Sequence, residues 1–268
     1  MDLREETERI ILEGYNEANA QAKLCQDIIL KAIYESGMAK NATIKGGVVM
    51  RSISGNARRA TQDIDIDLIR YSISDESIRT FISKLNCLEG LDIRIGGPII
   101  ELNHQDYKGK RVTITITDEH ANSLSLKMDI GVHKDLDIEQ DEYSFDIGFQ
   151  EDAVSLLINS PAQMITEKLK SLLRFGTRST RYRDAFDICY LSERADKKKL
   201  LYCMEKYIFE DNTLSVNNMT DVTLRLEQVF GSKSFIQSVN RSRRNWLDVS
   251  AEKAIASDLE FFRSISEQ

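Results

Sequence analysis

The densest group of chemically useful side chains is the segment 63–69, Asp-Ile-Asp-Ile-Asp-Leu-Ile, in which acidic and aliphatic residues alternate. A repeat of two residues is typical of a β-strand and places Asp63, Asp65 and Asp67 on one face, with successive Cα atoms of the three about 6.5–7 Å apart. Hard divalent ions such as Mg²⁺ bind carboxylate oxygens. The pattern therefore fits either a metal site or the solvated acidic face of an edge strand.

Two further features are compatible with a site for phosphate and metal. Gly46-Gly47 precedes a short predicted helix at 48–54, where backbone N–H groups without side chains can approach a phosphate. An ordinary tight turn is the alternative. Asp129 lies in the strand-like run 124–132, where an acid between apolar neighbours needs a partner. It joins the first carboxylates if its strand lies beside theirs.

A second group of charged residues lies at 167–187, EKLKSLLRFGTRSTRYRDAFD. Its cations are Lys168, Lys170, Arg174, Arg178, Arg181 and Arg183. Lys170 and Arg174 are neighbours on a helix, and Asp184 and Asp187 share a helix face. One interpretation is a surface that binds phosphates, with Lys168 as a point charge. The alternative is a pair of solvated helices with salt bridges.

Hydrophobic periodicity predicts the elements that position these residues. Helical spacing is found over 5–38, 48–54 and 75–87. Alternating β-branched residues predict strands at 63–69, 91–95, 111–117 and 124–132, and a short one near 145–147 inside the acidic segment 135–152. After Pro161 the pattern predicts helices at 161–174, 182–194, 196–208, 217–230, 233–239 and 250–265.

The order of these elements predicts an α+β fold, in which strands form one antiparallel or mixed sheet flanked by helices. We expect an α/β core with an N-terminal helix over residues 1–155, followed by a helical domain over residues 156–268.

Charge and composition exclude several classes of protein. The 36 Lys and Arg against 43 Asp and Glu give a net charge of −7, which excludes a general basic coat for nucleic acid but not a local basic groove. No apolar run reaches the roughly 18–20 residues that cross a bilayer, and the charged start MDLREETERI lacks a signal-peptide core. The four scattered cysteines lack zinc-site spacing. These features predict a cytoplasmic protein with no membrane partner.

Three motifs, in this order, resemble the AbiEii/AbiGii-type nucleotidyltransferase toxins of the polymerase-β-like superfamily: KGG at 45–47, RATQDID at 59–65, and EKL at 167–169 with RDAFDI at 183–188. The resemblance extends over residues 40–195. It implies a polymerase-β-like nucleotidyltransferase core with a helical domain that completes the active site.

The resemblance also implies roles for single residues. Asp63 and Asp65 would be a catalytic, metal-binding pair, with Asp129 as a third metal ligand. Lys168 and Asp184 would complete the catalytic set. Residues that would bind the nucleotide are Gly46, Gly47, Arg59 and Thr61, and we expect the neighbouring cations Lys45, Arg174 and Arg183 to join them. Val48 departs from the family pattern, which often has a hydroxyl residue there, and Asp67 has no assigned role.

The implied function is the transfer of an NMP from an NTP to an RNA, with a tRNA end as the expected acceptor, by the toxin of a toxin–antitoxin or phage-abortive-infection system. In this reaction a hydroxyl attacks the α-phosphorus and pyrophosphate leaves, and two metal ions can neutralise the charge. Mg²⁺ or Mn²⁺ would be the cofactor, and a separately encoded antitoxin a partner. The alternatives are transfer to a small molecule or a protein, and an inactive homologue that binds nucleotide and acts through a partner.

Overall fold

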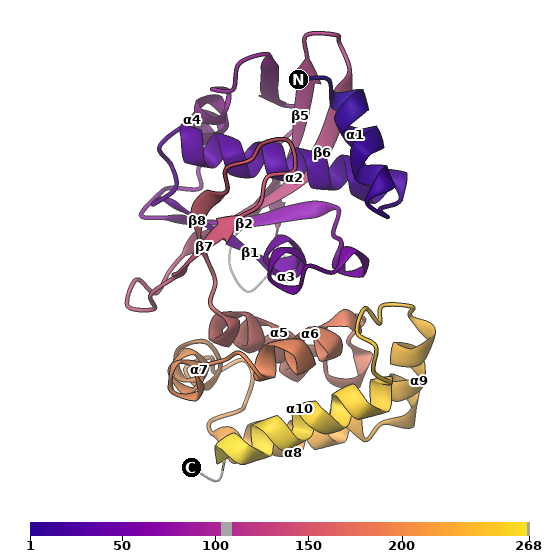
Figure 1. Ribbon diagram of the computed structural model, residues 1–268. Helices are drawn as coiled ribbons and strands as arrows, with labels where there is room; N and C mark the ends of the chain where they lie inside the picture. Colours follow the sequence, from indigo (N-terminus) through magenta and orange to yellow (C-terminus); the bar gives the residue numbers. More distant parts are fainter. Residues whose placement is uncertain (103–108, 267–268) are drawn as a thin grey trace. The chain divides into compact units, whose positions relative to one another are not determined.

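A computed structural model describes residues 1–102 and 109–266, and the chain divides into two compact units, Met1–Asn159 and Ser160–Gln268 (Figure 1). We call the first the sheet unit and the second the helical unit. In the described ranges, no helix is both long and apolar enough to cross a membrane.

The sheet unit contains one mixed sheet, whose described strands number eight and run in the order β3-β5-β6-β2-β1-β8-β7, with β4 paired to β5. The strand bounds are β1 Ala42–Lys45, β2 Asp63–Ile69, β3 Leu91–Ile95, β4 Ile100–Leu102, β5 Gly109–Asp118, β6 Ser123–His133, β7 Asp141–Phe145 and β8 Val154–Ile158. At the centre, β2 is parallel to β6 and antiparallel to β1. The predicted α+β fold with a mixed sheet is confirmed.

Alternation along β2 separates a buried face from a polar face. Ile64, Ile66 and Leu68 are fully buried, whereas Asp63 and Asp65 are partly exposed. The helices α2 (Glu17–Glu35) and α4 (Asp75–Leu85) supply further apolar side chains to the core, because α2 packs against β2, β6 and β8 and α4 packs against β3. The acidic strand predicted from the sequence is therefore present, with the same bounds.

The single helix expected over residues 5–38 is wrong, because the chain breaks there into α1 (Leu3–Leu12) and α2. Gly14 has φ +99°, which side chains with a Cβ rarely adopt, and it ends the first helix. Asn16 then starts the second, since its side-chain oxygen accepts a hydrogen bond from the Asn19 N–H at 3.0 Å.

Four strand assignments also differ from the sequence expectation. The strands β1, β4 and β8 were not predicted, and the strand expected near 145–147 lies at Asp141–Phe145. β8 is a short apolar run, VSLLI, whose period does not distinguish a strand from a helix. It pairs with β1 in parallel and with β7 in antiparallel orientation, and it extends the sheet unit past residue 155.

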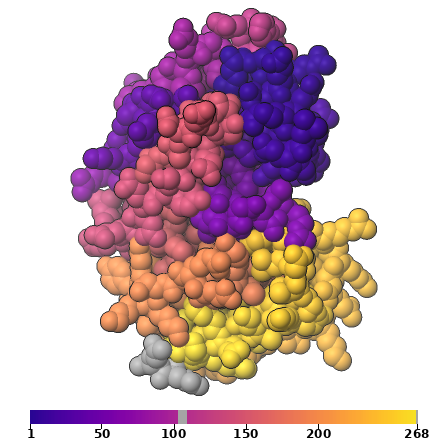
Figure 2. All heavy atoms as spheres, viewed as in Figure 1, coloured from indigo at the N-terminus to yellow at the C-terminus, as the bar shows by residue number. Residues whose placement is uncertain are grey.

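On the face shown in Figure 2, the indigo residues of the two N-terminal helices lie beside the rose segment near residue 150. Hydrogen bonds join these parts: the backbone N–H of Gly148 donates to Asp27 of α2, and its carbonyl accepts from Arg9 of α1. The N-terminal helices are thus fastened to the segment that follows β7.

The helical unit is built from α5 Pro161–Phe175, α6 Arg183–Ser192, α7 Lys197–Met204, α8 Met219–Phe230, α9 Lys233–Arg241 and α10 Ala251–Ser266. The first of these begins at a capping box, in which Ser160 and Gln163 bond reciprocally and Pro161 occupies the first turn. α7 ends earlier than expected, because Glu205–Phe209 form a π-helical turn. α10 packs along α6 and α8 (Figure 1).

Candidate active site

Charged residues form a row across the sheet on four neighbouring strands. In the strand register, Arg111 of β5 lies opposite Asp129 of β6. Asp129 in turn lies opposite Asp65 of β2, and Asp65 lies opposite Lys45 at the end of β1. Residues that are opposite each other in neighbouring strands point to the same face, and the strands are about 4.8 Å apart. The row therefore places two carboxylates between two cations.

Asp63 and Asp67 flank this row on β2. Asp67 is buried and its Oδ2 lies 2.9 Å from Lys45 Nζ, with the two side chains only 10% and 6% exposed. Lys45, which was expected to bind nucleotide, is thus an ion-pair partner of the third acid of the strand. The pair gives a structural role to Asp67, for which the sequence had indicated none.

Gly46 and Gly47 have neighbours so close that neither position has room for a side chain. Gly46 opens α3 (Gly46–Ser54) with φ +67°, and a Cβ built on it would lie 2.2 Å from Asp65 Oδ2. A Cβ on Gly47 would lie 2.6–2.8 Å from the side-chain atoms of Thr61. Backbone atoms at the N-terminus of α3 therefore lie directly against the acidic strand, which explains why two residues without side chains stand there.

The segment that precedes the acid pair is held by hydrogen bonds. Thr61 Oγ1 donates to Asp63 Oδ1 at 2.5 Å. From α2, the buried side chain of Gln26 donates to the carbonyls of Thr61 and Asp63 at 3.0 and 2.9 Å. Arg59 lies in the short 3₁₀ turn Ala57–Arg59 and is buried. These contacts fix the chain at the point where β2 begins.

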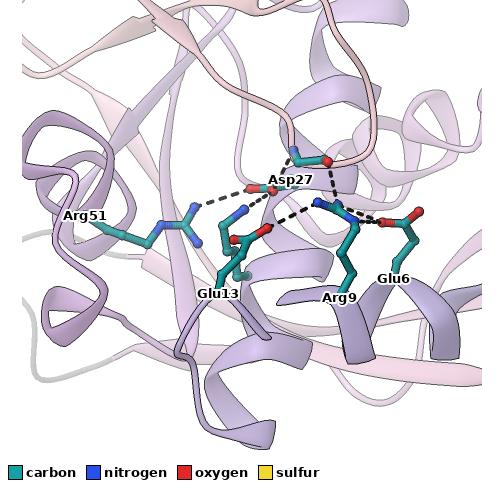
Figure 3. A network of polar contacts seen from close by, with 7 residues as sticks. Glu6, Arg9, Glu13, Asp27 and Arg51 are labelled. Carbon is teal, nitrogen blue, oxygen red and sulfur yellow. Dashed lines mark hydrogen bonds and ion pairs between the residues drawn. The ribbon is translucent and has the colours of Figure 1, made fainter. Parts of the chain in front are cut away.

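A polar network holds α3 from its other side (Figure 3). The buried carboxylate of Asp27 accepts from Arg51 of α3 at 3.4 Å and from Lys23 at 2.7 Å. It also accepts from the Gly148 N–H, whose carbonyl is bonded to Arg9. The helix that carries the glycine pair is thereby attached to α2 and, through Gly148, to α1.

In the helical unit, Lys168 of α5 is buried between two carboxylates of α6. Its Nζ lies 3.2 Å from Asp184 Oδ1 and 2.6 Å from Asp187 Oδ2, and its side chain is 8% exposed. Asp187 Oδ1 also accepts a hydrogen bond of 2.9 Å from Trp246 Nε1. The two acids that were expected to share a helix face do so, and they meet at the lysine.

The other cations of this stretch are placed differently. Arg174 and Lys170 both bind Asp211 Oδ2, at 3.1 and 2.8 Å. Although burial raises the pKa of Asp211, hydrogen bonds from Lys170 and Thr213 hold it well below its usual value. Arg183 begins α6 and is partly exposed. The nucleotide-binding roles of Arg174 and Arg183 stay predictions, and the ion pair with Asp211 accounts for the position of Arg174.

A family model described as the nucleotidyl transferase AbiEii toxin of a type IV toxin–antitoxin system matches residues 28–258. The chain belongs to the AbiEii nucleotidyl transferase toxin family. None of the curated proteins matches it. The matched range contains the glycine pair, the acidic strand and the Lys168 cluster, so the AbiEii resemblance expected from the motifs is confirmed.

AbiEii chemistry implies a divalent cation, and two residues of the sheet unit fit one. Asp63 and Asp65 are partly exposed on one face, and Mg²⁺ is commonly held by one or two carboxylates together with substrate phosphates and water. Across residues 1–102 and 109–266, no group of three or more His, Cys, Asp or Glu is arranged to hold a metal. Asp63 and Asp65 would therefore hold a divalent ion only together with substrate oxygens and water, and Mg²⁺, Mn²⁺ and a third ligand at Asp129 stay predictions.

Several residues of this AbiEii site are not evident from the sequence motifs. Arg111, Gln26 and Asp187 contact predicted site residues, and Trp246 contacts Asp187. Asp187 had a local signal, the spacing of three from Asp184. Arg111 had a weaker one, a cation in a run of β-branched residues. Gln26 contacts the start of β2, and Trp246 contacts Asp187, only through the tertiary fold of their own units.

Proposed function

We propose that this AbiEii-family toxin is a divalent-metal-dependent nucleotidyltransferase that transfers an NMP from an NTP to a hydroxyl of an RNA, with a tRNA end as acceptor. The observation that carries the proposal is the geometry around Asp65. Its carboxylate lies against the backbone of Gly46 at the start of α3, and Asp63 is two residues away on the same face.

The chain's own residues would act mainly by positioning. The first N–H groups of α3 are unpaired within the helix and favour a phosphate, which Gly46 and Gly47 allow to approach. Asp63 and Asp65 would hold the divalent ion, which supplies positive charge to the phosphates when bound. Lys168 and Asp184 would contribute to catalysis as the family motif implies.

The charge distribution supports RNA as the acceptor. The helical unit contains 18 Lys and Arg against 15 Asp and Glu, although the whole chain is acidic. Arg178, Arg241, Arg243 and Arg244 are exposed on it. Exposed Lys and Arg supply most of the affinity for a nucleic-acid backbone. The type IV toxin–antitoxin family also supports a separately encoded antitoxin as partner.

The test is to incubate the full chain with Mg²⁺, total RNA and each NTP labelled at the α-phosphate. We expect label in a discrete RNA, none when the γ-phosphate carries the label, and none with Asp63→Ala. Label in protein or in a small molecule would keep the reaction and change the acceptor. Binding of NTP and Mg²⁺ by calorimetry without any transfer would instead favour the inactive, partner-dependent homologue.

A further inference from the structure

Arg111 is bound to Asp129 by both arms of its guanidinium group. Nε lies 2.6 Å from Asp129 Oδ1, and Nη2 lies 2.7 Å from Oδ2, so each carboxylate oxygen accepts one hydrogen bond. The Asp129 side chain is 8% exposed, whereas that of Arg111 is 36% exposed. The carboxylate is thus buried beneath a cation that itself reaches solvent.

The bidentate pair leaves part of the guanidinium unused. A guanidinium has five N–H donors, and two of them bond Asp129. The remaining N–H groups belong to Arg111, which is the more exposed of the two side chains. An arginine fork matches phosphate oxygens as well as it matches a carboxylate, so the group retains donors suited to a second anion.

The position of Arg111 brings those donors to the candidate metal site. In the strand register Asp65 is the next residue of the same row, opposite Asp129. The hydrogen bond with Asp129 raises the pKa of Arg111 against the effect of burial, and the charges of Asp63 and Asp65 raise it further. The charges of both acids thus stabilise the protonated guanidinium.

We propose that Arg111 binds a phosphate of the NTP, and that Asp129 positions Arg111 and is not a metal ligand. This inference rests on the proposed nucleotidyl transfer and names the residue that recognises the triphosphate on the sheet. A phosphate placed between Arg111 and an ion on Asp63 and Asp65 would separate two cations that otherwise repel each other.

The alternative role for Asp129 has a structural cost. If Asp129 bound a metal ion, the ion would share one buried carboxylate with the cation Arg111, and displacing Arg111 to relieve their repulsion would lose two short charge-assisted hydrogen bonds. Breaking a buried ion pair by displacing one partner is strongly unfavourable. If a phosphate instead binds the exposed N–H groups of Arg111, both hydrogen bonds to Asp129 are kept.

The experiment has two arms, both on the full chain and both independent of turnover. In the first, Mn²⁺ binding without nucleotide is measured by calorimetry for Asp129→Asn and Asp65→Asn. We expect Asp65→Asn to weaken binding about tenfold or more, as loss of a ligand does, and Asp129→Asn to change it less than about threefold. Equal weakening by both variants would overturn the positioning role of Asp129.

In the second arm, the affinity for a non-hydrolysable NTP is measured for Arg111→Lys, which keeps the charge but lacks the fork. We expect about tenfold weaker NTP binding with Mn²⁺ binding unchanged. Arg94→Lys is the matched control, because Arg94 is exposed and pairs with Asp92 on β3 of the same sheet. If a single change unfolds the chain, the double variant Arg111→Gln with Asp129→Asn is used instead, because it leaves the net charge of the pair at zero.

The outcomes separate the two proposals. NTP affinity equal to wild type in both Arg111→Lys and the double variant would overturn the role of Arg111. A wild-type chain that binds no Mn²⁺ would contradict the proposed metal dependence, and the NTP arm would still decide the role of Arg111.

Discussion

The predicted site residues of the two units differ in their exposure to solvent. The sheet unit has 28 Asp and Glu against 18 Lys and Arg, and its key pair, Asp63 and Asp65, stays partly exposed on one face of a strand. The helical unit has a small excess of cations, and Lys168 is buried between Asp184 and Asp187. Alternation on a strand lets acids reach solvent, whereas a buried helix face requires each charge to be compensated.

This difference separates Asp63 and Asp65, which a ligand can reach, from charges that hold the fold, such as the Lys168 cluster and the buried Lys45–Asp67 pair. In the sheet unit, the acid pair stays on the solvent side while Ile64 and Ile66 form the core. In the helical unit, the Lys168 cluster reaches as far as Trp246, 59 residues away from Asp187 in sequence. We therefore expect removal of a buried, paired charge to reduce stability in either unit, and removal of Asp63 or Asp65 to affect mainly ligand binding.

The largest expected effect on stability is that of Lys168→Met, which leaves two buried acids without their shared cation. We expect a loss of about 3–5 kcal/mol in the free energy of unfolding. Trp246 is the single tryptophan of the chain, so its fluorescence during urea unfolding reports on the helical unit. Exposed Lys198→Met on α7 is the control, with a change below about 0.5 kcal/mol. A loss below 1 kcal/mol for Lys168→Met would show that the cluster does not stabilise the unit.

A smaller effect is expected for Trp246→Phe, which keeps an aromatic ring but removes the N–H that bonds Asp187. Leaving a buried acceptor short of one donor costs about 1–3 kcal/mol. Thermal unfolding followed by circular dichroism measures it, with exposed Tyr202→Phe as the control. Equal melting temperatures for Trp246→Phe and wild type would show that the indole N–H does not stabilise the Lys168 cluster.

Asp258 on α10 provides a pH-dependent test of the same unit. It is fully buried, neither carboxylate oxygen has a hydrogen-bond partner in the described chain, and burial raises its pKa well above the usual value. An acid with a raised folded pKa keeps its proton on folding, so stability falls as pH rises above the unfolded pKa.

Asp258→Asn removes that dependence. We expect the variant to be more stable than wild type at pH 8, by roughly 1 kcal/mol, and to differ little near pH 4. Melting curves at the two pH values give the comparison. If the variant were less stable than wild type by the same amount at both pH values, the Asp258 carboxyl group would pack favourably whether protonated or ionised.

The smallest expected effect belongs to the sheet unit. The double change of Asp63→Asn and Asp65→Asn relieves repulsion between acids on one face but weakens the hydrogen bond that Asp63 accepts from Thr61, so we expect a net change in stability within about 0.5 kcal/mol. The repulsion should matter less at high salt, because exposed charges are screened. Melting temperatures at two salt concentrations test this, and a loss above about 1 kcal/mol would mean that the acids support the fold.

The sequence predicts those features whose cause is local. The alternation in 63–69 gives β2 with its bounds, the glycine pair marks the start of α3, and the spacing of Asp184 and Asp187 puts both acids on one face of α6. The pairing of Arg111 with Asp129 depends on the register of β5 against β6, which no local pattern sets. The contacts of Trp246 with Asp187 and of Gln26 with Asp63 likewise depend on the tertiary fold. The helix break at Gly14 could not be predicted, because the apolar residues keep helical spacing on both sides of it.

The most direct measurement is the transfer of label from an α-labelled NTP to RNA by the wild type, Asp65→Asn and Asp92→Asn. Asp92 is the matched control, since it is an acid on β3 of the same sheet and pairs with Arg94 at the surface. We expect Asp65→Asn to lower the rate about 10²-fold or more with the fold intact, and Asp92→Asn to leave it unchanged. Transfer by Asp65→Asn at the wild-type rate would contradict a catalytic site on the acidic strand.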